Sequence, residues 1–136
     1  MCTRQKKNKM KNVLIHTRPD WPYVNVEVWF LYGAKNEPYG KSGVAHLLEH
    51  VKIAQMSFSG SLFAHSTLNG GTGSEIMRFQ FVSPKEFLLV NIQEFFMELV
   101  SKKFINRVID EQRQKVINEV LYRKNIQEYR MIYKAM

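Results

Sequence analysis

Apolar and polar residues alternate most regularly from Val24 to Tyr32, where Val, Phe or Tyr occupies every second position. This period of two predicts a β-strand with one face turned to solvent. Shorter apolar runs predict two further strands, at residues 13–15 and at residues 76–82. Residues 18–22 are expected to form a turn, because their two prolines lack a backbone donor and restrict their neighbours.

Three other segments carry the apolar spacing of amphipathic helices. The first extends over about residues 43–55, and Ser42 is its expected cap. The second follows residues 83–86, Ser-Pro-Lys-Glu, which have the form of a capping box. This helix continues to about Lys103, and it is apolar around so much of its circumference that we expect it to be well buried. The third helix begins near Asp110 and continues towards the end of the chain.

The segments between these elements contain turn residues. Residues 33–40 are expected to form a loop, as are residues 56–75, in which residues 69–71, Asn-Gly-Gly, are the strongest turn signal. The expected order β-β-α-β-α-α indicates an α+β fold, a largely antiparallel sheet with helices packed on one face. With 136 residues, the chain is expected to form one domain over residues 13–136 after a flexible basic tail at residues 1–12.

The net charge of +8 lies at the two ends of the chain. Residues 1–12 carry +5, residues 13–100 carry −2 and residues 101–136 carry +5. We expect a solvated basic surface rather than a nucleic-acid site, because no arginine-rich block or basic and aromatic ladder accompanies the charge. No apolar stretch approaches the roughly 20 residues of a membrane span. Cys2 is the single cysteine, so an internal disulfide is excluded. A chain that needs no oxidising compartment is expected in the cytoplasm.

The segment His46-Leu47-Leu48-Glu49-His50 lies in the first expected helix and contains the candidate chemistry. Residues four apart in a helix lie on the same face, so His46 and His50 can hold one metal ion. Zinc would need a third protein ligand and an open position for water. Glu49 projects near the same edge, where a carboxylate can take a proton from that water.

The flanks of this motif resemble those of a peptidase family. Residues 43–50, Gly-Val-Ala-His-Leu-Leu-Glu-His, are similar to the G-x-A-H-x-x-E-H pattern of the inverted zinc peptidases, the pitrilysin and insulinase group. In that family the third ligand is a glutamate roughly seventy residues further along, and Glu119 follows His50 by 69 residues. The resemblance implies that His46, His50 and Glu119 bind zinc and that Glu49 is the general base.

Two other glutamates of the last expected helix compete for the third ligand position. Glu111 lies near the start of the helix, where the helix dipole favours an acidic residue in any case. Glu128 lies in a polar stretch, where solvation is expected. Many members of the family carry a second acidic residue seven positions before the ligand, and here that position is Gln112. This departure concerns the surroundings of the metal site and not its ligands.

A second stretch also resembles the family. Asn69-Gly70-Gly71-Thr72 is similar to its N-A-x-T strand, to which substrate adds as an edge strand. The resemblance implies substrate binding by Asn69, Gly70 and Thr72, although glycine in place of the usual alanine weakens the strand propensity. The other interpretation is a glycine turn that leads into a core strand. Residues 56–61 only partly match the family's Phe-x-Gly-Thr, which predicts an altered connection.

The leading hypothesis is a zinc metallopeptidase that cleaves peptides with one zinc ion per chain, although manganese or cobalt can fill similar sites. A complete family domain continues well past the third ligand, and active members use a second, similar domain to hold the substrate. We therefore expect a homo- or hetero-oligomer that completes the substrate chamber. The alternative is a non-catalytic or weakly active interaction subunit of a peptidase complex that keeps the fold. A basic nucleic-acid or membrane-surface binder is disfavoured, because it leaves the metal motif unexplained.

Overall fold

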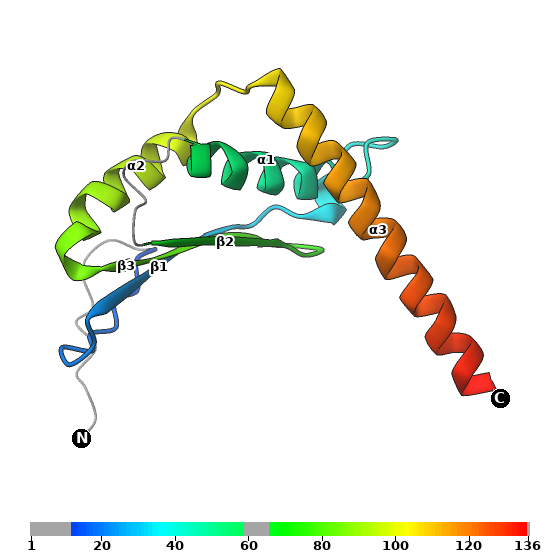
Figure 1. Cartoon of the computed structure of the whole chain (residues 1–136), viewed down its shortest axis with the longest axis horizontal. Helices are drawn as coiled ribbons and strands as arrows, with labels where there is room; N and C mark the ends of the chain where they lie inside the picture. Colours follow the sequence, from blue (N-terminus) through cyan, green and yellow to red (C-terminus); the bar gives the residue numbers. More distant parts are fainter. Residues whose placement is uncertain (1–11, 59–65, 136) are drawn as a thin grey trace.

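The computed structural model describes residues 12–58 and 66–135, and within them helices α1 and α2 cover one face of a three-stranded sheet (Figure 1). The α+β class expected from the sequence is confirmed, but the first helix precedes the second strand. The elements in chain order are β1 (Tyr23–Phe30), η1 (Ala34–Asn36), α1 (Val44–Phe58), β2 (Thr67–Thr72), β3 (Met77–Pro84), η2 (Lys85–Phe87), α2 (Leu88–Val100) and α3 (Asn106–Ala135).

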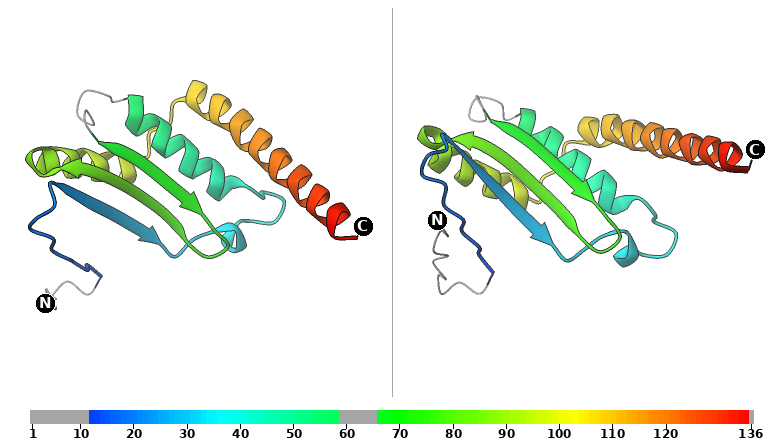
Figure 2. Two further views of the ribbon diagram at one scale, coloured as in Figure 1. Left: turned by 60° about the horizontal axis from the view of Figure 1, so that its bottom comes forward. Right: turned by 90° about the horizontal axis from the view of Figure 1, so that it is seen from below.

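The sheet has the strand order β1-β3-β2, and both neighbouring pairs are antiparallel. Val26 of β1 lies opposite Phe81 of β3, and Leu68 of β2 lies opposite the same phenylalanine from the other side. Alternate side chains of β3 are buried, as the period of two in a strand requires when one face is covered. Figure 2 shows that no described element covers the opposite face of the sheet.

Two expectations about strands and turns are wrong. Residues 13–15 form no strand and are exposed, because three apolar residues bury little surface and no described strand pairs with them. Residues 69–71 form the middle of β2, as the resemblance implies, so the turn interpretation is wrong; pairing with β3 and packing on α1 outweigh their turn propensity. The hairpin turn lies at residues 73–76, where the Gly73 N–H donates to the Ile76 carbonyl at 2.9 Å.

The N-terminus of α1 is capped by a side chain from the preceding loop and not by Ser42, which is exposed. The Glu37 carboxylate accepts hydrogen bonds from the backbone N–H groups of Gly43 at 2.8 Å and Ala45 at 2.7 Å. Gly43 has φ of +90°, a conformation that favours glycine. A carboxylate also suits the positive end of the helix dipole. Glu37 therefore fixes where α1 begins, directly ahead of His46.

The core lies between the covered face of the sheet and helices α1 and α2. Phe81 of β3 and Phe95 of α2 are fully buried, and their ring centroids are 4.8 Å apart. Truncating such an aromatic side chain to alanine typically costs about 3–5 kcal/mol of stability. The buried cluster consists of Ala45, Met56, Met77, Phe79, Phe81 and Phe95.

The start of α2 differs from the expected capping box. Ser83 lies in β3, where it is fully buried and accepts a hydrogen bond from Nδ2 of Asn91 at 2.8 Å. No side chain caps η2 or α2, so Glu86 does not fold back on a cap. Ser83 instead joins the first turn of α2 to the sheet through a buried bond.

Helix α2 is also less buried than its composition predicts. Within α2 the buried residues are Asn91 and Phe95, both on the side that faces the sheet. The expectation of burial around the helix fails because α2 packs on described elements along one side only. Its outer surface exposes Leu89, Val90, Phe96, Met97 and Val100.

A buried lysine joins α1 to the segment that links α2 with α3. Lys52 Nζ donates hydrogen bonds to the carbonyl of Glu98 at 2.9 Å and to the carbonyl of Ser101. Gln55 Nε2 donates to the carbonyl of Lys103 at 3.1 Å. These bonds satisfy carbonyl groups at and beyond the C-terminus of α2, and they hold the linking segment against α1.

Helix α3 begins at Asn106, ahead of the expected start near Asp110, and packs against α1 before it extends away from the sheet (Figure 1). Val108 and Val116 are buried in this contact region. No helix in the described part of the chain combines the length and the apolar composition that a bilayer span requires. Two expectations concern residues that the structure does not describe. These are the basic tail, of which only Asn12 is described, and the altered connection at residues 59–61.

Candidate metal centre

Two histidines lie side by side on the surface of α1. The ring centroids of His46 and His50 are 4.7 Å apart with an interplanar angle of 81°. Their Nε2 atoms are 3.1 Å apart. The spacing of four in the sequence predicts this arrangement, because such residues occupy the same helix face one turn apart.

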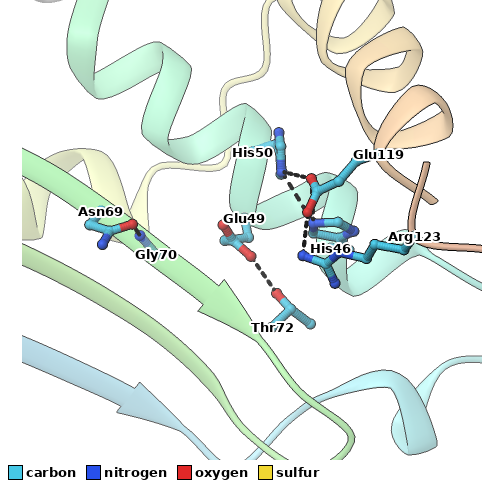
Figure 3. A network of polar contacts seen from close by, with 8 residues as sticks. All are labelled: His46, Glu49, His50, Asn69, Gly70, Thr72, Glu119 and Arg123. Carbon is cyan, nitrogen blue, oxygen red and sulfur yellow. Dashed lines mark hydrogen bonds and ion pairs between the residues drawn. The ribbon is translucent and has the colours of Figure 1, made fainter. Parts of the chain in front are cut away.

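Glu119 of α3 approaches the same point (Figure 3). Its Oε2 lies 3.5 Å from Nε2 of His46 and 3.4 Å from Nε2 of His50. The ligand atoms of the three residues all lie within 4.8 Å of one another, so the group could hold a metal ion. Packing of α3 against α1 brings together residues that are 69 positions apart in the sequence.

The donor atoms have the spacing of a zinc site. Zinc binds histidine nitrogen at about 2.0–2.1 Å and carboxylate oxygen at about 2.0–2.2 Å with tetrahedral geometry, which puts neighbouring ligand atoms roughly 3.3–3.5 Å apart. The three observed distances are 3.1, 3.4 and 3.5 Å. Three atoms with lone pairs repel one another at such distances unless a proton or a cation lies between them. The residues therefore fit zinc in both chemistry and spacing.

Arg123 holds the other oxygen of the ligand carboxylate, a contact that the sequence analysis missed. Its guanidinium donates to Oε1 of Glu119, which leaves Oε2 facing the two imidazoles (Figure 3). Hydrogen bonds of this kind orient ligands in metal sites. The signal in the sequence is the spacing of four between Glu119 and Arg123, which places a carboxylate and a guanidinium on one helix face.

Glu49 points from α1 towards Thr72 of β2 (Figure 3). Its side chain is buried, and its residue surface is 5 % exposed. Oε2 of Glu49 accepts a hydrogen bond from Oγ1 of Thr72 at 2.8 Å. The Thr72 hydroxyl thereby fixes the orientation of a carboxylate next to the histidine pair.

Strand β2 also passes close to Glu49 at Gly70. A Cβ at this position would lie 2.6 Å from Cδ1 of Ile53 and 3.0 Å from Oε1 of Glu49, so the approach depends on glycine. The Gly70 N–H donates to Oδ1 of Asn69 at 2.8 Å. In the described part of the chain, β2 has a neighbouring strand on one side only. Asn69, Gly70 and Thr72 therefore lie along an edge strand beside the candidate metal centre.

A cavity of about 700 Å³ joins these groups. Its walls are α1, β2 and α3, and this volume lies within the range of about 300–1,000 Å³ that is usual for ligand pockets. The β2 wall consists of residues 68–72, none of which has a charged side chain. The charged side chains on the α3 wall are Glu111, Lys115, Glu119 and Arg123.

The geometry selects Glu119 over Glu111 as the third candidate ligand. Glu111 lines the cavity but lies outside the metal-ligand group, and its carboxylate pairs with Arg107 at 3.7 Å. Gln112 is buried and lines the cavity too, so a neutral amide occupies the place of the family's second acid. The side chain of Glu128 lies outside the part of the chain that the structure describes.

These features define an α+β domain with a candidate two-histidine, one-glutamate metal site. The chain is similar in structure to a protease from Helicobacter pylori, with a TM-score of 0.61 and 22% sequence identity. The match covers 77% of this chain and 27% of that protease chain. No protein-family model and no curated protein matches the sequence. The likeness shows that this chain shares the fold of part of that protease, about a quarter of its length.

Proposed function

We propose that this chain carries the metal site of a zinc-dependent endopeptidase that cleaves peptide bonds with water. The observation that carries the proposal is the convergence of His46, His50 and Glu119 on one point, beside the buried carboxylate of Glu49. Two histidines and a glutamate, with a further acidic group nearby, are typical of hydrolytic zinc sites. The fold shared with the H. pylori protease supports the same class.

Each residue of the site has a defined part in this reaction. His46, His50 and Glu119 would hold zinc, which when bound supplies Lewis-acid activation of water and of a carbonyl group. Glu49 accepts the proton of the attacking water and passes it to the leaving amine nitrogen. The hydrogen bond from Thr72 holds the Glu49 carboxylate in place, and its burial shields the transferred proton from bulk water.

In this proposal β2 is the strand to which the peptide substrate adds. Backbone hydrogen bonds along an edge strand give affinity, and pockets for alternate side chains give specificity. The Gly70 N–H donates at present to the Asn69 side chain, and a carbonyl of the substrate would take over that donor. The missing side chain at Gly70 keeps the peptide backbone close to Glu49.

Zinc analysis and three glutamate variants test the proposal. Protein purified without added metal is expected to contain about one zinc ion per chain. Glu49→Gln should keep the zinc and lower peptide cleavage about 10²–10⁴-fold, the contribution of a general base. Glu119→Gln should lower zinc affinity at least about tenfold, since it removes a charged ligand. Glu111→Gln, which makes the same chemical change on the same helix, should retain both properties.

Two outcomes would change the conclusion. Far less than one zinc ion per chain, with Glu119→Gln indistinguishable from the parent protein, contradicts the metal site. Stoichiometric zinc without cleavage of any peptide, both alone and with a candidate partner domain, favours the non-catalytic interaction subunit. Metal analysis and cleavage are therefore both needed, because each addresses a different part of the proposal.

A further inference from the structure

We propose that the cavity selects peptides with an acidic side chain beside the bond to be cleaved, and that Lys115 is the residue that selects them. The inference rests on the peptidase function proposed above and adds the class of its substrate. It follows from the charges on the α3 wall of the cavity.

The face of α3 that lines the cavity carries two cations around the ligand carboxylate. Lys115 lies one helical turn before Glu119 and Arg123 one turn after it, and both cations line the cavity. Gln112, also on this face, is neutral. Within one helical turn of Glu119 in either direction, α3 therefore places no other acidic side chain on the cavity wall.

The two cations differ in what they already bind. Arg123 is bonded to Oε1 of Glu119, so its charge is committed to the ligand. Lys115 makes no salt bridge or hydrogen bond within the described residues, and its ammonium group is free for a substrate. The nearest acid one turn before it, Glu111, pairs with Arg107.

The remaining walls do not offset the charge of Lys115. The β2 wall, residues 68–72, is uncharged, and a peptide that adds there lies opposite α3. Glu49 is buried on the side of α1 nearest β2 and is bonded to Thr72. An acidic side chain on such a peptide would meet an uncommitted cation, whereas a basic side chain would be repelled by Lys115.

Peptide binding to the zinc-loaded chain in a Glu49→Gln background tests the inference without cleavage. Three short fluorescent peptides would carry Glu, Gln or Lys next to the same central residue and be otherwise uncharged. The Glu peptide should bind about two- to fivefold more tightly than the Gln peptide, the usual range for one exposed ion pair. The preference should weaken as ionic strength rises.

Variants at Lys115 test whether this residue causes the preference for the Glu peptide. Lys115→Met should bind the Glu and Gln peptides equally, and Lys115→Glu should favour the Lys peptide by a similar factor. Lys102→Met removes an exposed lysine outside the cavity and should leave the preference unchanged. Circular dichroism would establish that each variant is folded. Lys115→Met should abolish the preference and Lys115→Glu should reverse it, so a general loss of binding cannot imitate the expected result.

The outcomes separate this inference from the peptidase proposal. Equal affinity for the three peptides, no binding of any of them, or a preference that persists in both Lys115 variants overturns the role of Lys115. If zinc content and Glu49-dependent cleavage are intact in that case, the peptidase proposal stands. If zinc binding and cleavage are absent, the peptidase proposal fails on its own measurements.

Discussion

Glycine at residue 70 shows how closely the strand beside the site fits against α1. The resemblance to the N-A-x-T strand makes alanine the usual residue, yet in this chain Ile53 and Glu49 occupy the space that a methyl group would take. Glycine weakens the strand propensity at this position, but it leaves room for the Ile53 and Glu49 side chains of α1. Glycine here is a requirement of packing, because β2 and α1 approach each other at this point.

Alanine at residue 70 is expected to destabilise the protein and to disturb Glu49. Gly70→Ala should cost about 1–3 kcal/mol, the typical cost of overpacking. Adding Ile53→Val removes the atom 2.6 Å from the new methyl group and should recover much of the stability. Activity should recover less, since the contact with Oε1 of Glu49 remains. Denaturant unfolding and peptide cleavage measure the two effects separately.

Gly71→Ala is the matched control for this substitution. It makes the same change in the same strand, but nothing lies within 4 Å of a Cβ at residue 71. Its effect on the free energy of unfolding should stay within about 0.5 kcal/mol. If Gly70→Ala proves equally mild and cleavage is unchanged, Glu49 is not held by packing against β2.

Helices α1 and α3 supply all three candidate ligands, so the site depends on how these two helices are held together. Lys52 contributes by bonding the carbonyls of Glu98 and Ser101 at the end of α2, just before the chain turns into α3. Burial lowers the pKa of its ammonium group, and the charge of Glu98 opposes that shift. Through these bonds, Lys52 holds the segment before α3 in a fixed position relative to α1.

Lys52→Met should loosen this link. Two carbonyl groups lose a donor, which predicts a loss of about 1–3 kcal/mol in the free energy of unfolding. Zinc affinity should fall as well, because Glu119 is placed less accurately relative to the histidines. Lys41→Met, an exposed site in the loop before α1, is the control. A stability loss with unchanged zinc affinity would show that Lys52 supports the fold without positioning the ligand.

The pH dependence of unfolding gives a second measurement for Lys52. A lysine with a lowered pKa in the folded state binds its proton less tightly there than in the unfolded chain. Its contribution to stability therefore rises with pH through the window between the folded pKa and the ordinary value of 10.5. Lys52→Met should remove this rise, while Lys41→Met should keep it.

Over the molecule as a whole, one layer of helices covers one face of the sheet (Figure 2). In the described part of the chain, α2 leaves an apolar outer surface. Leu89, Met97 and Val100 are each at least 70% exposed. Apolar residues gathered on one helix face mark a contact with another protein surface. Self-association through this surface stays a prediction, which the following substitutions test.

Polar substitutions on this surface should reduce association without unfolding the chain. Leu89→Gln combined with Met97→Gln is expected to change the free energy of unfolding by less than about 0.5 kcal/mol per site, because both side chains are already exposed. Sedimentation over a range of concentrations should show weaker self-association than in the parent protein. Gln93→Ala, an exposed position on the same helix, is the control. A parent protein that stays monomeric at every concentration would contradict self-association through this surface.

The local parts of the site were predictable from the sequence. His46 and His50 are placed by the helical repeat alone, and the apolar residues around them predict that helix. The α+β class was likewise predictable, since strands and helices differ in the period of their apolar residues. Local errors arose at the helix ends, where Glu37 caps α1 in place of Ser42 and Ser83 is used inside the sheet.

The resemblance could name Glu119 as the third ligand, but spacing alone could not decide between it and Glu111. A separation of 69 residues implies no particular distance, and only the packing of α3 on α1 brings Oε2 to within 3.5 Å of both rings. Residues 69–71 likewise have turn propensity by themselves and become a strand only because β3 pairs with them. The sequence by itself determined the helix-borne histidine pair, because residues four apart in an α-helix lie on the same face about one turn apart. Tertiary structure decided the third ligand and the strand beside it, because the energies that place them come from contacts between distant segments.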